Sequence, residues 1–171
     1  MKKILENRKG FTLVELLAVI VVLAIVMGMA VVGITSVLEN TRKSAFAADA
    51  KSYLEGAHQL VRADEANKLL GGTTTYAPSC STGTTQTTFI KIDDIPLDSG
   101  GKSPYGNEYV KCGSTTPTAA TTTCSFIRVT ATVTGTSCAY SYDIFLTDSV
   151  YNIPFTAEDQ VNAGKVVKKT S

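Results

Sequence analysis

The chain has 171 residues, about one domain's worth, and is nearly neutral, with 16 basic and 15 acidic side chains. Near-neutrality argues against a protein that coats nucleic acid, because that role needs an excess of basic residues. The charges are unevenly spread, since the 23 residues from Leu16 to Leu38 contain no charge and no proline. This run excludes an ordinary soluble cytoplasmic protein and leaves the 100 residues from Gly72 to Ser171 for a head with one modest core.

The apolar run predicts a membrane-spanning helix. At a rise of about 1.5 Å per residue it measures about 34 Å, enough to cross a hydrocarbon core of about 30 Å. The ten residues before Phe11 hold four basic residues against one acid, and positive charge retains that end in the cytoplasm. Arg42 and Lys43 follow the run but are fewer, so we expect the chain from Lys43 onward to lie outside the cell.

Two simpler interpretations compete for this segment. A secretory signal peptide has an apolar region of about 7–15 residues and then a small-residue cleavage site, for which Ala45-Phe46-Ala47 would serve. The run is longer than that, and charged residues lie between it and the site. A plain signal anchor is the stronger alternative, and only residues outside the run can distinguish it.

A motif lies across the start of the run, Lys9-Gly10-Phe11-Thr12-Leu13-Val14-Glu15. A short basic leader ending in glycine, followed by Phe-Thr-Leu, an apolar residue and Glu, resembles the processing site of type IV pilins and their relatives. The resemblance covers residues 1 to about 40, and the rest of the chain matches only in layout. It implies that prepilin peptidase cleaves between Gly10 and Phe11 and that the new amino group of Phe11 is methylated.

Glu15 is the only acidic residue between Glu6 and Glu39. A carboxylate within a membrane segment is costly, so it marks a candidate functional site. The Phe11 ammonium exists only after cleavage, and a desolvated cation and anion each remove the other's penalty. The resemblance implies that Glu15 contacts the amino terminus of a neighbouring subunit, so that cleavage gates assembly. The alternative is an acid that merely extends to the membrane interface.

The helical pattern continues past the membrane segment. Apolar residues recur three and four positions apart, which indicates one stripe of an amphipathic helix that stops at Gly71-Gly72. The stripe comprises Phe46, Ala50, Tyr53, Ala57, Leu60 and Val61. We expect one helix from Thr12 to Leu70, apolar all round in its first half and striped in its second.

Beyond Gly72 the sequence is rich in Thr, Ser and Gly and predicts an antiparallel sheet. The expected strands are Thr88–Ile92, Asn107–Cys112, Ser125–Val133 and Cys138–Leu146. Alternating apolar residues in the last two, with a short glycine-containing link between them, favour a hairpin. We expect the apolar face of the sheet to cover the helix stripe. One or two helical turns should follow, capped by Thr156 and ending near Gly164.

The predicted fold class is therefore α+β, a long N-terminal helix packed on an antiparallel β-sheet head, which is the type IV pilin-like fold that the resemblance implies. The expected segments are residues 1-10 as the leader, 11-38 as the transmembrane or filament-core helix, 39-71 as the amphipathic helix and 72-171 as the extracellular head.

All four cysteines lie in the part expected outside the cell, where an even number favours disulfides. If Asn107–Cys112 and Ser125–Val133 are neighbouring strands, a Cys112–Cys124 bond closes a Thr-rich loop at its base, and Cys80–Cys138 remains. Four cysteines allow three pairings, and free buried thiols are the alternative. The spacings do not suit zinc, for which closer pairs are typical.

The sequence contains no nucleophile motif, phosphate-binding loop or pair of catalytic carboxylates, and its one histidine, His58, falls on the predicted helix. We expect no enzymatic activity, no cofactor and no metal site. The resemblance implies a structural subunit of a type IV pilus. We favour the major pilin, which would polymerise into surface filaments for adhesion, twitching motility or biofilm formation.

The same resemblance implies the partners and the location. The subunit would cross the cytoplasmic membrane once, with its head outside, and then join an extracellular pilus. It would contact copies of itself through the N-terminal helices, prepilin peptidase, and an assembly platform with its ATPase; host surfaces or DNA are further partners. The alternatives are a pseudopilin or minor pilin of a secretion or competence machine, and a monomeric membrane-tethered extracellular binding domain.

Overall fold

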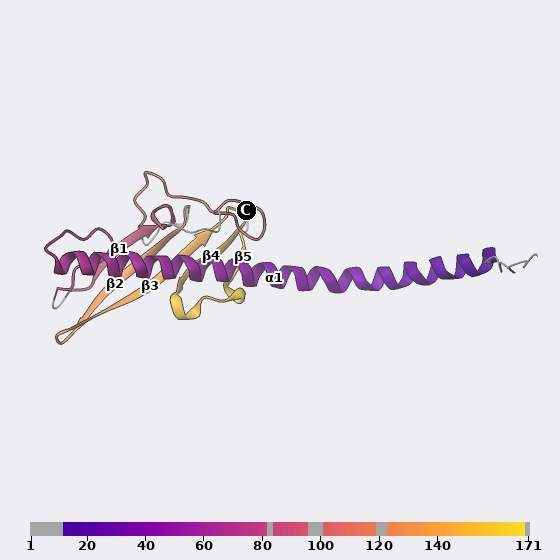
Figure 1. Cartoon of the computed structure of the whole chain (residues 1–171), viewed down its shortest axis with the longest axis horizontal. Coiled ribbons are helices and arrows are strands. Elements are labelled where there is room, and N and C mark those ends of the chain that lie inside the picture. Colours follow the sequence, from indigo (N-terminus) through magenta and orange to yellow (C-terminus); the bar gives the residue numbers. More distant parts are fainter. Residues whose placement is uncertain (1–11, 82–83, 96–100, 119–122, 170–171) are drawn as a thin grey trace, which may run out of the picture. The chain divides into compact units, whose positions relative to one another are not determined.

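The computed structural model describes residues 12–81, 84–95, 101–118 and 123–169, without the side chains of 30–33. Helix α1 (Leu13–Leu69) comes first (Figure 1). The strands are β1 (Gln86–Lys91), β2 (Phe126–Thr134), β3 (Ser137–Thr147), β4 (Tyr151–Ala157) and β5 (Val167–Lys168). Three short 3-10 turns complete the elements, η1 (Ile92–Asp94), η2 (Glu158–Gln160) and η3 (Ala163–Lys165). The chain divides after Glu39 into two compact units.

In the first unit, α1 leaves its apolar side chains uncovered. The large apolar side chains described between Leu13 and Leu38 are from 46% (Leu38) to 81% (Leu13) exposed. The helix contains a stretch long and apolar enough to cross a membrane. Burial of apolar surface is strongly favourable, so this segment needs either lipid or other apolar helices around it.

In the second unit, α1 buries one stripe against the sheet, as the periodicity predicts. The buried residues of the stripe are Phe46, Ala47, Ala50, Tyr53, Leu54, Ala57 and Val61. Leu60 lies at the edge of the stripe and is only partly buried. Each large side chain of this kind stabilises the fold by about 1.5–3 kcal/mol when fully buried, so the stripe holds the helix on the sheet.

The sheet is an antiparallel meander in which the strands lie side by side in the order β1-β2-β3-β4-β5. Strands β2 and β3 pair continuously from Phe126 opposite Phe145 to Thr134 opposite Ser137. Gly135 lies in the turn between them with a φ of 65°, a conformation that favours glycine. The predicted hairpin and the predicted α+β class are both confirmed.

The two faces of the sheet carry different side chains. Toward the helix, the strands contribute Ile90, Ile127, Val129, Tyr142, Ile144, Leu146 and Ile153 to the core. Other residues form a second cluster, in which Phe126 and Phe145 pack with the buried Cys112 and Cys124. Phe126 has a centroid 5.8 Å from that of Phe89 and 5.9 Å from that of Phe155, so aromatic rings cover this part of the sheet.

The strand predicted over Asn107–Cys112 is wrong. Among the described residues, this segment makes one isolated bridge, between Lys102 and Glu108. Gly106 and Gly113 bound it with φ values of 90° and 54°, which turn the chain at both ends. The segment nevertheless lies across the strand ends, because Val110 N donates to Thr147 O and Ser125 N donates to Val110 O, each at 2.8 Å.

Tyr109 holds this irregular segment on α1. Its ring is 3% exposed and meets the rings of Phe46 and Tyr53 edge-on, at centroid distances of 5.3 and 5.8 Å. Its hydroxyl donates to Asp49 Oδ2 at 2.6 Å. Burial raises the pKa of the Asp49 carboxyl, and the hydrogen bond from Tyr109 opposes that effect.

The one or two helical turns predicted after Thr156 do form, as 3-10 turns, but Thr156 is not their cap. Thr156 lies in β4, opposite Ile144, and the chain then forms the turns η2 and η3. Pro154 makes this segment look unlike a strand, but the β3–β4 register shifts between Ile144 and Leu146. Proline is tolerated at such an irregularity because no regular ladder hydrogen bond is needed there.

Gly56 allows α1 to approach the segment after β1 closely. A Cβ placed on Gly56 would lie 2.3 Å from Cγ2 of Ile95, which is itself 5% exposed. A side chain at this position therefore cannot be accommodated unless Ile95 moves.

We predict that Gly56→Ala destabilises the head. Overpacking typically costs about 1–3 kcal/mol, which outweighs the gain in helix propensity of about 1 kcal/mol. Urea unfolding of the full chain in detergent, followed by near-ultraviolet circular dichroism, measures the change. Ala48→Gly, at an exposed helix position, is the control for propensity alone. A Gly56→Ala protein more stable than the parent would contradict the close approach.

Candidate processing and assembly site

The first turn of α1 positions Glu15 through Thr12. The Thr12 backbone N and the Thr12 hydroxyl both donate to Glu15 Oε2 at 2.9 Å, and Glu15 N donates to Thr12 Oγ1 at 3.3 Å. This reciprocal arrangement is a capping box, in which Thr12 is the N-cap. The T-x-x-E spacing that indicates such a box is present in the sequence. From the sequence, Thr12 and Glu15 are recognised only as parts of the processing motif, and the box itself is not predicted.

The arrangement holds a carboxylate at the positive end of the helix. Glu15 is exposed, and its neighbours along α1 are the exposed apolar side chains of the first unit. Within the described residues, Oε1 of Glu15 accepts no hydrogen bond, so it is available to a cationic partner. The predicted cleavage junction, Gly10-Phe11, lies outside the described residues.

A family profile described as the prokaryotic N-terminal methylation motif matches residues 6–31. The match includes the predicted junction and Glu15. Comparison with curated proteins and with solved structures finds no match for this chain. The motif and the α+β fold together define a protein with the type IV prepilin-like signature.

The chain is thus a type IV pilin- or pseudopilin-like protein, of a class whose members are typically structural rather than enzymatic. The methylation motif implies processing by prepilin peptidase. With the apolar helix, it indicates a location in the membrane or in a pilus.

The head contains two disulfides, in the pairs that the sequence favours. Cys112 bonds to Cys124 with a Cα–Cα distance of 5.0 Å, and Cys80 bonds to Cys138 with a Cα–Cα distance of 5.9 Å. The first pair is buried and closes a short loop, which the chain-entropy account values at about 3 kcal/mol. The backbone contact between Val110 and Ser125 brings these cysteines together, although the segment before Cys112 is not a strand.

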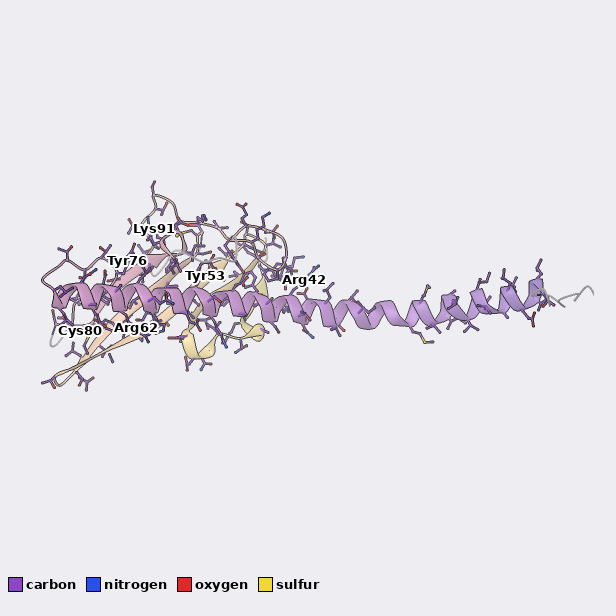
Figure 2. All side chains as sticks on the ribbon, viewed as in Figure 1. Arg42, Tyr53, Arg62, Tyr76, Cys80 and Lys91 are labelled. Atoms are coloured by element: carbon purple, nitrogen blue, oxygen red, sulfur yellow. A yellow bond between two sulfur atoms is a disulfide. The ribbon has the colours of Figure 1, made fainter. Side chains whose placement is uncertain are left out.

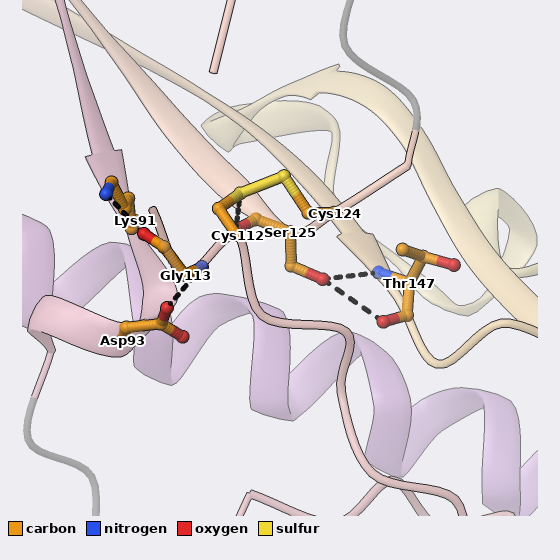
Figure 3. Close-up of a disulfide and its surroundings, with 7 residues drawn as sticks. All are labelled: Lys91, Asp93, Cys112, Gly113, Cys124, Ser125 and Thr147. Carbon is orange, nitrogen blue, oxygen red and sulfur yellow. Dashed lines mark hydrogen bonds between the residues drawn. A yellow bond between two sulfur atoms is a disulfide. The ribbon is translucent and has the colours of Figure 1, made fainter. Parts of the chain in front are cut away.

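The chain around Cys112–Cys124 is fixed by polar contacts on both sides (Figure 3). Lys91 Nζ donates to Gly113 O at 2.6 Å, and Gly113 N donates to Asp93 Oδ2 at 3.0 Å. Beyond the bond, Ser125 Oγ donates to Thr147 O at 3.1 Å and accepts from Thr147 N at 3.0 Å. The disulfide is therefore a structural bond within a satisfied network.

A carboxylate organises the chain after α1. Asp64 is 7% exposed, and its Oδ2 accepts hydrogen bonds from the backbone N atoms of Thr75 (2.7 Å), Ala77 (3.0 Å) and Tyr76. Burial by itself would raise the pKa of Asp64, but the three N–H donors outweigh it and lower the pKa below its ordinary value. Helix α1 ends just before Gly71, which has a φ of 82°. The hydrogen bonds to Asp64 then hold the following chain against the helix.

A groove of about 640 Å³ lies beside this turn and includes Leu69, Pro78, Cys80 and Tyr140 in its lining. The Tyr140 hydroxyl lies 3.3 Å from Sγ of Cys80, which is bonded to Cys138. Burial, helped by the nearby Glu65, raises the pKa of Tyr140 to about 12, so the phenol stays protonated at neutral pH.

His58 links α1 to η2. Its ring centroid lies 3.8 Å from that of Tyr142, and its Nε2 lies 2.9 Å from Glu158 Oε1. These contacts make it a packing residue. Within the part of the chain that the structure describes, no group of three or more His, Cys, Asp or Glu is arranged to hold a metal.

We predict that Asp64→Ala destabilises the head by about 1–3 kcal/mol, because buried N–H groups lose their acceptor. Since folding lowers the pKa of Asp64, its contribution is complete above the ordinary carboxyl value of about 3.9 and is lost as the pH falls through the folded value. Urea unfolding between neutral and acid pH tests both points. Asp159→Ala, at an exposed position, is the matched control, and an equal effect of the two changes would contradict the assignment.

Proposed function

We propose that this protein is a structural subunit of a type IV pilus, and specifically the major pilin. The observation that carries the proposal is the position of Glu15, which the capping box holds in the first turn of α1, four residues beyond the proposed new amino terminus at Phe11. The proposed roles of the filament are adhesion, twitching motility or biofilm formation.

The exposed apolar surface of α1 supports assembly through the N-terminal helices. In the membrane, lipid covers these side chains; outside it, only other apolar helices can do so. A Cβ on Gly28 would meet nothing within 4 Å, which leaves room for a neighbouring helix to approach closely. The filament core proposed here is therefore a bundle of these helices from many identical subunits.

The charge pair supplies the control of assembly. Cleavage between Gly10 and Phe11 creates an ammonium group, and in an apolar bundle that cation and the Glu15 carboxylate of a neighbour each stabilise the other. In an uncleaved chain the Phe11 nitrogen is part of a peptide bond and carries no charge. We therefore propose prepilin peptidase, an assembly platform and its ATPase as partners, with the cytoplasmic membrane holding the processed subunit until assembly.

Two alternatives make different predictions. A pseudopilin or minor pilin would be scarce in filaments sheared from the cell surface, whereas the major pilin would dominate them; the 100-residue head from Gly72 favours a displayed subunit. A monomeric tethered binding domain would keep its leader, so an intact mass that includes Met1 in membrane-extracted protein would support it.

We predict that Gly10→Val blocks processing in the native host. A side chain at the residue whose carbonyl is attacked would collide with a tight peptidase site. A barrier higher by about 1.4 kcal/mol slows cleavage about tenfold, and we expect at least that effect. Intact-mass analysis of the membrane fraction measures the leader. Gly28→Ala is the glycine control, and normal shortening of the Gly10→Val protein would show that cleavage occurs elsewhere.

We predict that Glu15→Ala permits cleavage but reduces the yield of filaments by about tenfold or more, because the neighbour's ammonium is left unpaired in an apolar site. The variant should accumulate in the membrane as mature-length monomer. Quantifying sheared filaments against processed protein in the membrane tests this. Glu39→Ala removes an acid at the other end of the apolar run and should assemble normally; filament yield unaffected by Glu15→Ala would show that apolar packing suffices.

A further inference from the structure

Beyond Leu38, the large apolar side chains that are exposed in the described part of the chain lie in two places. Leu69 and Leu70 follow one another at the end of α1, whereas Val150 and Val167 belong to the β3–β4 turn and to β5, 39% and 44% exposed. The second pair is separated in sequence but is brought together by the sheet, because β4 pairs with β5 directly beside the turn.

The turn that carries Val150 is rigid. Asp148 is 2% exposed, and its Oδ1 accepts hydrogen bonds from Val150 N at 3.0 Å and from Tyr151 N at 2.6 Å. Its Oδ2 accepts one from the Ser103 hydroxyl at 2.5 Å. Ser149 has a φ of 76°, an uncommon conformation for a residue other than glycine. The fold therefore maintains a strained turn that presents an apolar side chain to the outside.

Basic residues flank this turn. Lys168 lies opposite Tyr151 in the β4–β5 ladder, and Lys169 N donates to Val150 O at 2.8 Å. Both lysine side chains are exposed. Because side chains alternate along a strand, Lys168 lies on the side of Tyr151, whereas Val167 lies on the other side of this short ladder. The two lysines thus place two positive charges at the end of the ladder that carries the exposed valines.

Aromatic rings connect the turn to α1. The rings of Tyr105 and Tyr151 stack with their centroids 3.6 Å apart, and the Arg42 guanidinium lies 5.9 Å from the centre of the Tyr105 ring. Figure 2 shows Arg42 on α1 at one end of the head and Cys80 at the opposite end. In the sequence, Arg42 follows Leu38, the last residue of the apolar run, by four residues.

We propose that this surface binds the headgroup region of a membrane that contains anionic lipid. The interfacial patch, as we call it, lies at the end of the β4–β5 ladder and consists of Arg42, Tyr105, Val150, Tyr151, Val167, Lys168 and Lys169. Tyrosine is enriched at membrane interfaces, and each juxtamembrane basic residue is attracted to anionic headgroups. The valines can enter the boundary of the acyl chains, so the combination fits a lipid surface.

The neighbouring acids leave the patch positive. Asp148 is buried and accepts several hydrogen bonds, and the Asp49 carboxylate accepts one from Tyr109 at 2.6 Å. Glu108 is exposed and pairs through its backbone with Lys102. A basic residue therefore lies next to the Glu108 carboxylate in the fold. The inference rests on the proposed placement of the apolar run in the membrane, and it adds a second contact through which the head itself is held until assembly.

Fluorescence can test this, because the chain contains no tryptophan. Full-length Tyr151→Trp protein is reconstituted in vesicles of phosphatidylcholine alone or mixed with equal phosphatidylglycerol, each with lipids brominated high on the acyl chains. Gln59→Trp, at an exposed position of α1 in the head, is the matched control, and Leu23→Trp reports on the membrane helix. Hydrogen exchange of the native sequence over 149–152 and 166–169 gives a second measurement that needs no substitution.

We expect the bromolipids to quench the Tyr151→Trp protein in the mixed vesicles and not the Gln59→Trp protein, with slowed exchange over both segments. Adding Lys168→Gln and Lys169→Gln to Tyr151→Trp should lower the ratio of bound to unbound heads by about fivefold per lysine.

Three outcomes would overturn the inference, and they are distinguishable. Quenching of the Leu23→Trp protein, together with an unquenched Tyr151→Trp protein and unslowed exchange, would overturn the patch alone. Protection that appears only at high protein density would assign the patch to a second copy and overturn it. An unquenched Leu23→Trp protein would overturn the membrane placement and this inference with it.

Discussion

One helix has to satisfy its apolar side chains in two different ways, and the rest of the molecule depends on this. Up to Leu38, the large apolar side chains of α1 that the structure describes are exposed and require lipid or other helices. From Phe46, a single stripe is covered by the sheet of the same chain. A chain with these two halves covers one of them by its own fold and leaves the other to its surroundings, as the proposed exchange of a membrane for a polymer requires.

The head buries apolar side chains on both faces of its sheet. The helix stripe covers one face, and aromatic rings with the Cys112–Cys124 bond cover part of the other. Arg128 lies over this second cluster, 4.3 Å from the centre of the Phe155 ring and 2.7 Å from Asp143 Oδ2. Long irregular connections lie against the sheet because buried carboxylates, such as Asp64 and Asp148, satisfy their backbone N–H groups.

The sequence predicted what periodicity and local motifs determine. The helix stripe and the β2–β3 hairpin have clear periods, and the processing motif marks Glu15. The sequence does not predict strand β4, because proline is unusual within a strand. Pro154 is accommodated at a shift in the β3–β4 register, and such a shift cannot be recognised from the pattern of one strand. Asn107–Cys112 has the composition of a strand, but glycines turn the chain on both sides of it. The capping partner of Glu15 was available in the spacing, whereas the contacts of Tyr105 with Arg42 and Tyr151 arise only from tertiary packing.

The Cys80–Cys138 bond also sets how far a head can be stretched. The cysteines are 58 residues apart in the chain, a stretch that would span about 200 Å if drawn out fully. Force that enters through α1 reaches the bond shortly after the helix ends, and the bond passes it directly into β3. While the bond is intact, the intervening length, with β1 and β2 in it, cannot be drawn out between the end of α1 and β3. A filament of such subunits could therefore not lengthen by unravelling this part of its heads.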